Sequence, residues 1–177
     1  MQSVIASGAG LALARLAPAQ DAGGAVPVDE RSIELLNTHT NETALVVFRR
    51  GIEYDAAAVA TLRNVLRDHR NDESHDIDVR LYDQLHALAL AARCDARFEV
   101  ISGYRSPASN AQMSTPGSGV AKRSLHMEGR AIDVRLHKCP CADLRDLALA
   151  AAQGGVGYYK RSDFVHIDTG AFRTWIG

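Results

Sequence analysis

Two short segments in the C-terminal half of the chain constrain its fold most, because aliphatic and other side chains alternate along both. They are AIDVRL (131–136) and FVHID (164–168). Alternation with a period of two is typical of a strand that buries one face. Opposite the aliphatic side chains, the first segment carries Asp133 and the second carries His166, and neither residue type lies in a buried strand without a partner. The chain is therefore expected to build a sheet with one aliphatic face and one face able to carry chemistry.

Helices and strands follow one another along the whole chain. Apolar periodicity and capping residues predict four helices and three further strands. These elements are a β-hairpin over 32–48, helices that begin after Asp55, Asp78 and Ser106, a strand over 97–102, and a helix over 141–153 ended by Gly154. Because helices dominate the first half and no repeat is present, we expect a single α+β domain with a small, mainly antiparallel sheet and helices packed on one side.

Residues 1–29 differ in composition from the rest of the chain. They are rich in small apolar residues and include Ala17-Pro18-Ala19, which is typical of the cleavage site of a secretory signal. The basic start of such a signal is incomplete, since no Lys or Arg precedes Val4, and Arg15 interrupts the apolar run. A disordered Ala/Gly-rich tail is the alternative. We expect an exported protein of the periplasm or cell envelope, with residues 30–177 as its folded domain.

Charge and cysteine content exclude several classes of protein. The 177 residues contain 20 Lys and Arg against 21 Asp and Glu, a formal net charge of −1, so no basic surface for nucleic acid is expected. No apolar run is long enough for a transmembrane segment. Cys94, Cys139 and Cys141 are too few for a disulfide framework, although export would allow Cys94 to pair with one of the others. We expect structural or incidental roles for them.

A third candidate ligand lies just before the first alternating segment. His126 stands in the glycine-containing stretch SLHMEGR (124–130), which can turn back toward Asp133. With His166, these residues would supply two nitrogens and one oxygen and leave a fourth tetrahedral position for water, as in catalytic zinc sites. Structural zinc sites are instead closed by four ligands. The alternative is a set of hydrogen-bonded polar residues at strand edges, and the spacing alone does not decide between them.

Longer motifs around these residues resemble a known family. SLHMEGRAID (124–133) and DFVHIDTG (163–170) resemble the S-x-H-x-x-G-x-A-x-D and D/E-x-x-H pair of the zinc D-Ala-D-Ala metallopeptidases. Their superfamily also contains lysostaphin-type enzymes and the hedgehog signalling domain. Segments such as ISGYRSPASNAQM and GGVGYYKRSDFVHIDTGAFRTW are similar to the murein endopeptidase K type. The resemblance covers the chain from about Ile33 to Trp175.

The resemblance implies a Zn²⁺ site on the open face of the sheet, with His126, Asp133 and His166 as the ligands. It also implies that Asp163 is the general base that takes a proton from a zinc-activated water. Related dipeptidases have Glu at that position, whereas Asp is expected in the endopeptidase K type. Asp168 competes for this role, but we expect it to be structural and to orient a ligand or a neighbouring backbone group.

Other residues acquire roles from the same resemblance. Arg105 is implied as the partner of the oxyanion in the tetrahedral intermediate, since a guanidinium is always charged and offers several donors; otherwise it is a surface arginine before a helix. Ser124 and Tyr104 are expected to bind substrate or to support groups behind the ligands. Packing, rather than lining a groove, is the expected use of Tyr158, Tyr159 and Trp175.

The resemblance implies a murein endopeptidase that acts on the peptide stems and cross-links of peptidoglycan. Both D-Ala–diaminopimelate and diaminopimelate–diaminopimelate bonds are open as targets. A D,D-carboxypeptidase that trims free stems is also open, and the choice depends on a groove that the loop 114–122 is expected to border. A non-catalytic zinc-containing module that binds cell wall or protein, as in hedgehog, is the alternative from another class. Asp163 and Arg105 favour the enzyme, because a binding module needs neither.

Overall fold

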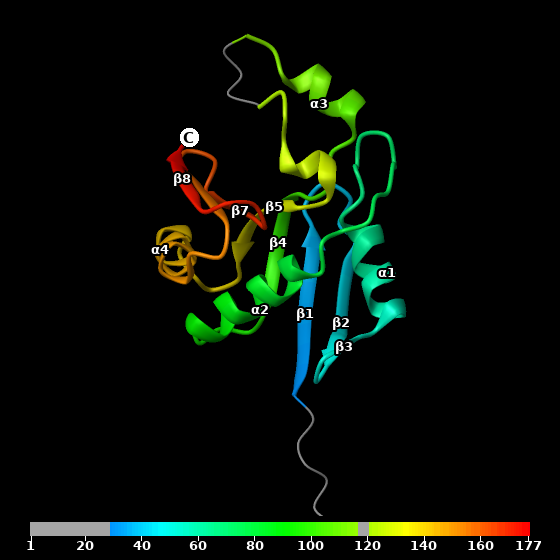
Figure 1. Cartoon of the computed structure of the whole chain (residues 1–177), viewed down its shortest axis with the longest axis vertical. Coiled ribbons are helices and arrows are strands. Elements are labelled where there is room, and N and C mark those ends of the chain that lie inside the picture. Colours follow the sequence, from blue (N-terminus) through cyan, green and yellow to red (C-terminus); the bar gives the residue numbers. More distant parts are fainter. Residues whose placement is uncertain (1–28, 117–120) are drawn as a thin grey trace, which may run out of the picture.

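A mixed sheet of eight strands forms the centre of the molecule, in a computed structural model that describes residues 29–116 and 121–177 (Figure 1). The strands are β1 (Glu30–Asn37), β2 (Thr43–Arg50), β3 (Glu53–Tyr54), β4 (Arg97–Ser102), β5 (Ala131–Leu136), β6 (Gly155–Tyr159), β7 (Phe164–Asp168) and β8 (Arg173–Ile176). Their order across the sheet is β3-β2-β1-β4-β5-β7-β6-β8. Residues 1–28 of the signal-like segment 1–29 and the centre of the predicted loop, 117–120, lie outside the described residues.

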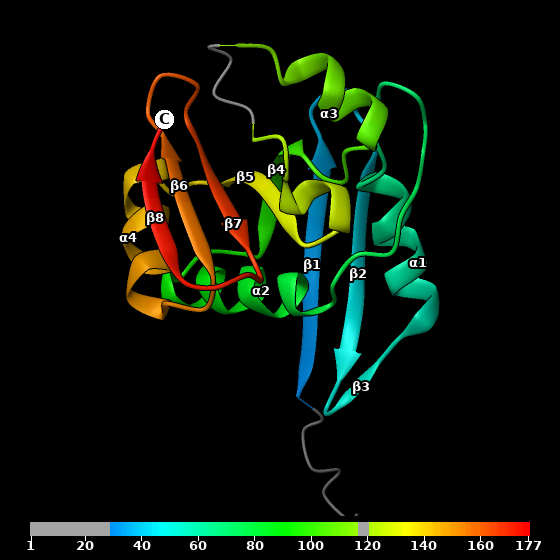
Figure 2. The same ribbon diagram turned by 45° about the horizontal axis from the view of Figure 1, so that its top comes forward.

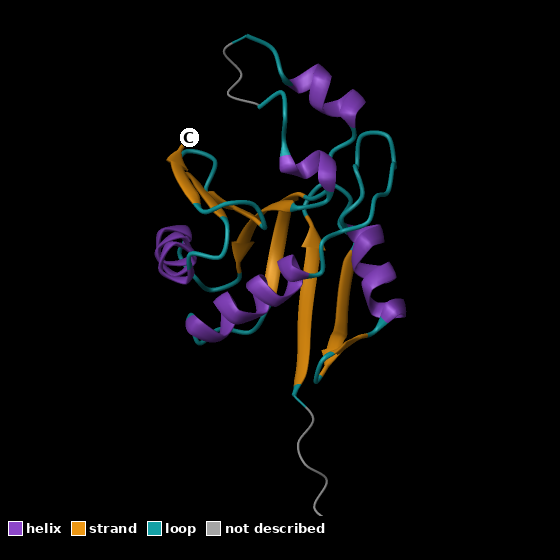
Figure 3. Cartoon of the chain, viewed as in Figure 1, coloured by secondary structure: helices purple, strands orange, loops and turns teal. Residues whose placement is uncertain are grey.

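Helices α1, α2 and α4 pack against the strands, whereas α3 and the short 3₁₀ helix η1 lie near one end of the sheet (Figures 1, 2 and 3). The helices are α1 (Ala56–Val65), α2 (Arg80–Ala91), α3 (Pro107–Met113), η1 (Leu125–Glu128) and α4 (Cys141–Ala151). The predicted caps Asp55 and Ser106 are confirmed, since each side chain accepts backbone N–H groups of the first turn. None of the helices in the described residues combines the length and apolarity that a bilayer crossing requires.

The single α+β domain is confirmed, whereas the sheet is larger than the sequence predicted and is mixed. Only β1–β4 and β6–β8 pair in parallel. Strands β3, β6 and β8 were not predicted. The sequence of β6, GVGYY, contains two glycines that hide its alternation, β3 has two residues, and β8 is a short, mostly exposed edge strand.

The aliphatic face of β5 and β7 lies in the core, as the alternation predicted. Val134 and Val165 are fully buried in one cluster that also contains the inward side chains of the three covering helices. Among these are Leu62 of α1, Leu85 of α2 and Leu144 of α4. Burial of each such side chain contributes about 1.5–3 kcal/mol. This packing holds β5 and β7 side by side and leaves their other face free for polar residues.

Two predicted helix ends differ from the structure. Helix α2 begins at Arg80, after Asp78, whose carboxylate accepts the Arg80 N–H and also the hydroxyl of Thr169. The aspartate therefore joins the start of α2 to the end of β7 instead of capping the helix alone. Helix α4 ends at Ala151, and its C-cap Ala152 has the left-handed conformation, with φ of 50°, before Gly154 is reached. Because helix ends depend on tertiary contacts, local capping signals place them only to within a few residues.

Candidate metal centre

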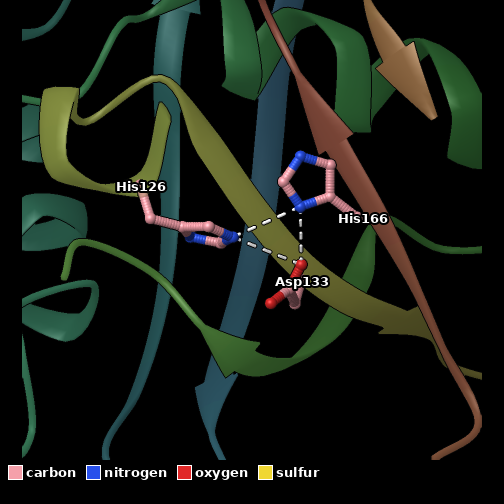
Figure 4. Close-up of side chains that lie close together, drawn as sticks. All are labelled: His126, Asp133 and His166. Carbon is pink, nitrogen blue, oxygen red and sulfur yellow. Dashed lines mark hydrogen bonds and ion pairs between the residues drawn. The ribbon is translucent and has the colours of Figure 1, made fainter. Parts of the chain in front are cut away.

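His126, Asp133 and His166 converge on the open face of the sheet from three different elements (Figure 4). Asp133 of β5 stands directly opposite His166 of β7 in the antiparallel register, and residues in opposite positions project to the same face. His126 comes from η1, which immediately precedes β5. All three side chains are buried. The structure thus brings together the three residues that the motifs predicted as ligands.

The turn after η1 aims His126 at the strand. Gly129 ends η1 in the left-handed conformation with φ of 64°, which glycine adopts without a steric penalty. A Cβ at this position would lie 2.0 Å from the carbonyl oxygen of Asp76, so no other residue fits. At the other end, the hydroxyl of Ser124 accepts the backbone N–H of His126 at 3.4 Å. Ser124 therefore caps η1, the short helix that carries His126.

The three converging atoms have the spacing of a tetrahedral metal site. His166 Nδ1 lies 2.8 Å from Asp133 Oδ1, His126 Nε2 lies 3.2 Å from His166 Nδ1, and His126 Nε2 lies 3.4 Å from Asp133 Oδ1. Ligands about 2.0–2.1 Å from a tetrahedral ion stand about 3.3 Å apart. Two imidazole nitrogens and one carboxylate oxygen are also ligands that zinc accepts. The donor set therefore suits a zinc ion, and two of the three separations are close to the tetrahedral value.

Each histidine is held from behind by a hydrogen bond of its second ring nitrogen. His126 Nδ1 lies 2.7 Å from the carbonyl oxygen of Gly103, and His166 Nε2 lies 3.0 Å from a carboxylate oxygen of Asp168. A ring nitrogen that donates its proton backward leaves the other nitrogen with a free lone pair. With a metal bound, the free nitrogens would be the two that point at Asp133, Nε2 of His126 and Nδ1 of His166. This is the orientation that a metal ligand needs, and it gives Asp168 the structural role that the sequence predicted.

Asp168 is itself held by an unusually complete set of donors. Its fully buried carboxylate accepts the backbone N–H groups of Gly155 at 2.9 Å and of Gly170 at 2.8 Å. It also accepts two bonds from Arg173, at 2.6 and 3.1 Å. Sequence reasoning missed Arg173 and Gly155, because they lie in β8 and β6, the strands that it did not predict. Only the glycine two residues after Asp168 carried a local signal, since that spacing is typical of a turn.

The charges of this cluster support one another. Burial raises the pKa of Asp133, but the two neighbouring histidines outweigh burial and hold it well below the usual range. Burial likewise lowers the pKa of His166, whereas hydrogen bonds to Asp133 and Asp168 raise it above the ordinary value. The carboxylate of Asp133 is thus kept ionised inside the protein, and the centre is preorganised to hold positive charge.

Arg105 lies inside the protein next to this centre, so the surface alternative is wrong. Its side chain is only 7% exposed, and its backbone N–H donates to the His126 carbonyl oxygen at 3.2 Å. The guanidinium donates to Ser102 and Asn110, both at 3.3 Å, and within the described part of the chain its buried Nε has no partner. Burial lowers the pKa of Arg105 and Asp133 acts against this, so the two charges lie within electrostatic reach.

Asp163 is not part of the cluster of three ligands, and its contacts in the described part of the chain are with Arg135 and Cys141. It occupies the β6–β7 hairpin with φ of 52°, and its side chain is 70% exposed. Its carboxylate lies 3.8 Å from Arg135 Nε. Arg135 follows Asp133 by two residues in β5, so both side chains project from the open face. Asp163 therefore stands at the edge of that face, next to Arg135, and among the described residues no contact joins it to the ligands.

Tyr104 and the cysteines lie away from the convergent ligands. The Tyr104 ring stacks on His75, with ring centroids 5.0 Å apart. Cys94, Cys139 and Cys141 are free thiols in the structure, and Cys141 is buried. Within residues 29–116 and 121–177, the three residues of Figure 4 are the only close group of three potential His, Cys, Asp or Glu ligands.

Comparison with known proteins shows to which family the chain belongs. The family model described as peptidoglycan L,D-endopeptidase MepK matches residues 25–175. The peptidoglycan L,D-endopeptidase MepK of Escherichia coli (strain K12) is 39% identical over 145 residues, which are 82% of this chain and 80% of that protein. The probable peptidoglycan L,D-endopeptidase MepK of Haemophilus influenzae is 36% identical over 149 residues, 83% of this chain and 80% of that protein. No solved structure matches. The predicted resemblance is confirmed, and the chain belongs to the MepK family of peptidoglycan endopeptidases within the zinc D-Ala-D-Ala metallopeptidase-like group.

Proposed function

We propose that this protein is a zinc-dependent murein endopeptidase that hydrolyses an L,D peptide bond in the cross-links of peptidoglycan. The observation that carries the proposal is the convergence of His126, Asp133 and His166 in a chain of this family. The relatives are named as endopeptidases of peptidoglycan, and the distances among the three ligand atoms suit one tetrahedral metal ion.

Stereochemistry selects between the two cross-links that the sequence left open. A D-Ala–diaminopimelate bond joins two D centres, whereas a diaminopimelate–diaminopimelate bond joins an L centre to a D centre. The relatives are named L,D-endopeptidases. The proposed target is therefore the diaminopimelate–diaminopimelate bond, and the partners are the stem peptides on both sides of it.

Zn²⁺ is the proposed cofactor, held by His126, Asp133 and His166. When bound, it supplies a Lewis acid and a water of lowered pKa. The chain contributes the orientation of the ligands, since Gly103 and Asp168 hold the second nitrogens of the two histidines. Three protein ligands leave one position for the reaction, in contrast to the four ligands of a structural site.

Arg105 and Asp163 are the proposed catalytic side chains. The buried Nε–H of Arg105 has no partner in the described part of the chain, which leaves it free to donate to an oxyanion. Its burial removes the water that would weaken this interaction. The exposed carboxylate of Asp163, at the edge of the open face, is accessible to accept a proton from water and to return it to the leaving amine. Ser124 and Tyr104 support the segments that carry His126 and Arg105.

The proposed place of action is the cell envelope, because the substrate lies outside the cytoplasmic membrane. Residues 30–177 form the proposed zinc peptidase domain, and the family model matches nearly the same range. The preceding residues serve as the signal-like segment that their composition predicts. A reporter fused after residue 29 tests this assignment, because the fusion must reach the periplasm if these residues direct export.

The decisive experiment combines zinc analysis with digestion of defined cross-linked muropeptides by the full chain. We expect about one zinc per chain and conversion of diaminopimelate–diaminopimelate dimers into monomers, read by mass spectrometry. D-Ala–diaminopimelate dimers serve as the matched substrate and should persist. Release of terminal D-Ala alone would indicate a carboxypeptidase, and zinc without any product would indicate a binding module. Absence of zinc under metal-replete conditions would contradict the proposed site.

A further inference from the structure

The row of residues that contains two of the ligands continues across the sheet to its edge. His166 of β7 stands opposite Gly157 of β6, and Gly157 stands opposite Trp175 of β8. With Asp133 on the other side of His166, four strands contribute to this row. Residues in opposite positions project to the same face. Trp175 therefore lies on the face of the metal ligands.

Gly157 allows Trp175 to reach the metal centre. A Cβ on Gly157 would lie 2.4 Å from Cε2 and 2.7 Å from Nε1 of the indole, so any larger residue would displace the ring. The indole covers the bare backbone of β6 and contacts the ring of His166, with ring centroids 4.9 Å apart. Trp175 thus forms a wall of the centre on the side of β8.

The indole N–H of Trp175 holds a second aromatic side chain. It donates to the hydroxyl oxygen of Tyr159 at 3.1 Å. Tyr159 follows Gly157 by two residues in β6 and projects to the same face. Its ring stacks on Phe164, with centroids 4.5 Å apart and planes 18° apart. The tyrosine ring is therefore fixed by a stacking partner and a hydrogen bond at once.

This hydrogen bond leaves the proton of the tyrosine hydroxyl available. A phenol donates one hydrogen bond and accepts others. The oxygen of Tyr159 accepts from Trp175, and no acceptor for its own proton exists among residues 29–116 and 121–177. Burial lowers the pKa of Arg105 and Arg70 adds to this, whereas Asp133, then Asp68 and last Tyr159 act against it. The phenol thus lies within electrostatic reach of the guanidinium, although the two come from opposite sides of the ligand row.

We propose that Tyr159 is a second catalytic hydrogen-bond donor to the peptide oxygen at the scissile bond, and that Trp175 is the positioning residue that aims its hydroxyl. This inference rests on the proposed function and deepens it, because it assigns two donors, Arg105 and Tyr159, to one developing oxyanion. Donors fixed before the reaction stabilise such a charge most effectively.

The neighbouring Tyr158 offers a matched control for the test. It projects to the opposite side of β6, where it packs beside the core and its ring lies under Arg145, 4.7 Å from the guanidinium carbon. Tyr159→Phe and Tyr158→Phe each remove one hydroxyl from adjacent positions. In the zinc-loaded full chain, we expect Tyr159→Phe to lower kcat about a hundredfold with KM and zinc content unchanged. Tyr158→Phe should stay within about twofold of the parent, since it removes no donor from the centre.

Two outcomes overturn the role of Tyr159. Equal kcat in the two variants would show that the hydroxyl does not act on the reaction. Loss of zinc from Tyr159→Phe would make the residue structural. If the parent protein hydrolyses no cross-link, the proposed function fails. The role of Tyr159 can then still be tested by calorimetry, with a phosphinic analogue of the L,D dipeptide as the ligand. We then expect Tyr159→Phe to bind the analogue about tenfold more weakly than Tyr158→Phe; equal affinities, or no binding by the parent, would contradict the inference.

The positioning role of Trp175 is tested by a double-mutant cycle. Trp175→Phe keeps an aromatic ring against His166 and removes the indole N–H. If Trp175 acts through Tyr159, the double variant should have the kcat of Tyr159→Phe alone, because the same interaction is lost once. Losses that multiply in the double variant would show that the indole acts independently.

Discussion

The two faces of β5 and β7 are built from the same eleven residues and behave as opposites. One face carries Val134 and Val165, which are sealed under the helices. The other carries Asp133 and His166, which are almost as deeply buried and which hold charged or hydrogen-bonding partners in each other, His126 and Asp168. On the first face, burial itself stabilises the fold. On the second, burial is tolerated only because loops and neighbouring strands supply partners.

Alanine substitutions at the adjacent residues Asp133 and Val134 of β5 should show the largest difference between the two faces. Asp133→Ala removes a ligand, so we expect loss of zinc and of detectable hydrolysis with little change in the free energy of unfolding. Val134→Ala should lower that free energy by about 2 kcal/mol through lost packing and keep both zinc and activity. Elemental analysis and urea denaturation of the two variants measure this. Retention of zinc by Asp133→Ala would contradict the ligand assignment.

Substitution of Asp163 tests the proposed base at the edge of the open face. Asp163→Asn keeps a side chain that tolerates φ of 52° and cannot take up a proton. We expect kcat to fall by about 10²–10⁴ while zinc content and stability stay unchanged. The measurement is steady-state hydrolysis of the cross-linked dimer. A variant with the parent's kcat would assign the base to another group.

Substitution of Asp168 tests how far the hydrogen bond behind His166 contributes to zinc binding. Asp168→Asn removes the charge that holds His166 and Arg173, so zinc affinity should fall by about 10–100-fold. A chelator competition measures this. Asp146→Asn is the matched control, because Asp146 is an exposed residue of α4 whose charged partner is its neighbour Arg145. Equal zinc affinities in the two variants would show that the contact to His166 does not tune the site.

Asp68 is another buried carboxylate with hydrogen-bonding partners, and it supports the segment that carries Arg105. Its carboxylate is fully buried and accepts the backbone N–H of Ser106 at 2.9 Å. Burial raises the pKa of Asp68, but hydrogen bonds from Ser109 and Ser106 outweigh it and lower the pKa to about 2. Because the folded pKa is depressed, the stabilisation is present above pH 4 and is lost as the pH falls toward 2.

Asp68→Asn should therefore lower the free energy of unfolding by about 2 kcal/mol at neutral pH and by little near pH 2. Urea denaturation of metal-free parent and variant across this range measures the difference. A difference that is independent of pH would show that packing, and not the charge, is responsible.

Much of the fold was predictable because its signals are local. The hairpin β1–β2, the strands β4, β5 and β7, and the caps Asp55 and Ser106 all follow from alternation, turn residues or capping chemistry within a few positions. Strands β6 and β8 escaped prediction, since their order depends on pairing with distant strands and not on their own composition.

The sequence by itself determined which side chains share the open face and, through two motifs, that His126, Asp133 and His166 belong together. Only the tertiary structure decided how they are supported and what stands beside them. It places Asp163 at the edge of the face, Arg173 on Asp168, and Trp175 over Gly157. The physical reason is the distance along the chain over which each feature is set. Side-chain alternation is fixed within one strand. These contacts instead arise where strands that are far apart in the chain pair in one register, and where a missing Cβ leaves room for a ring.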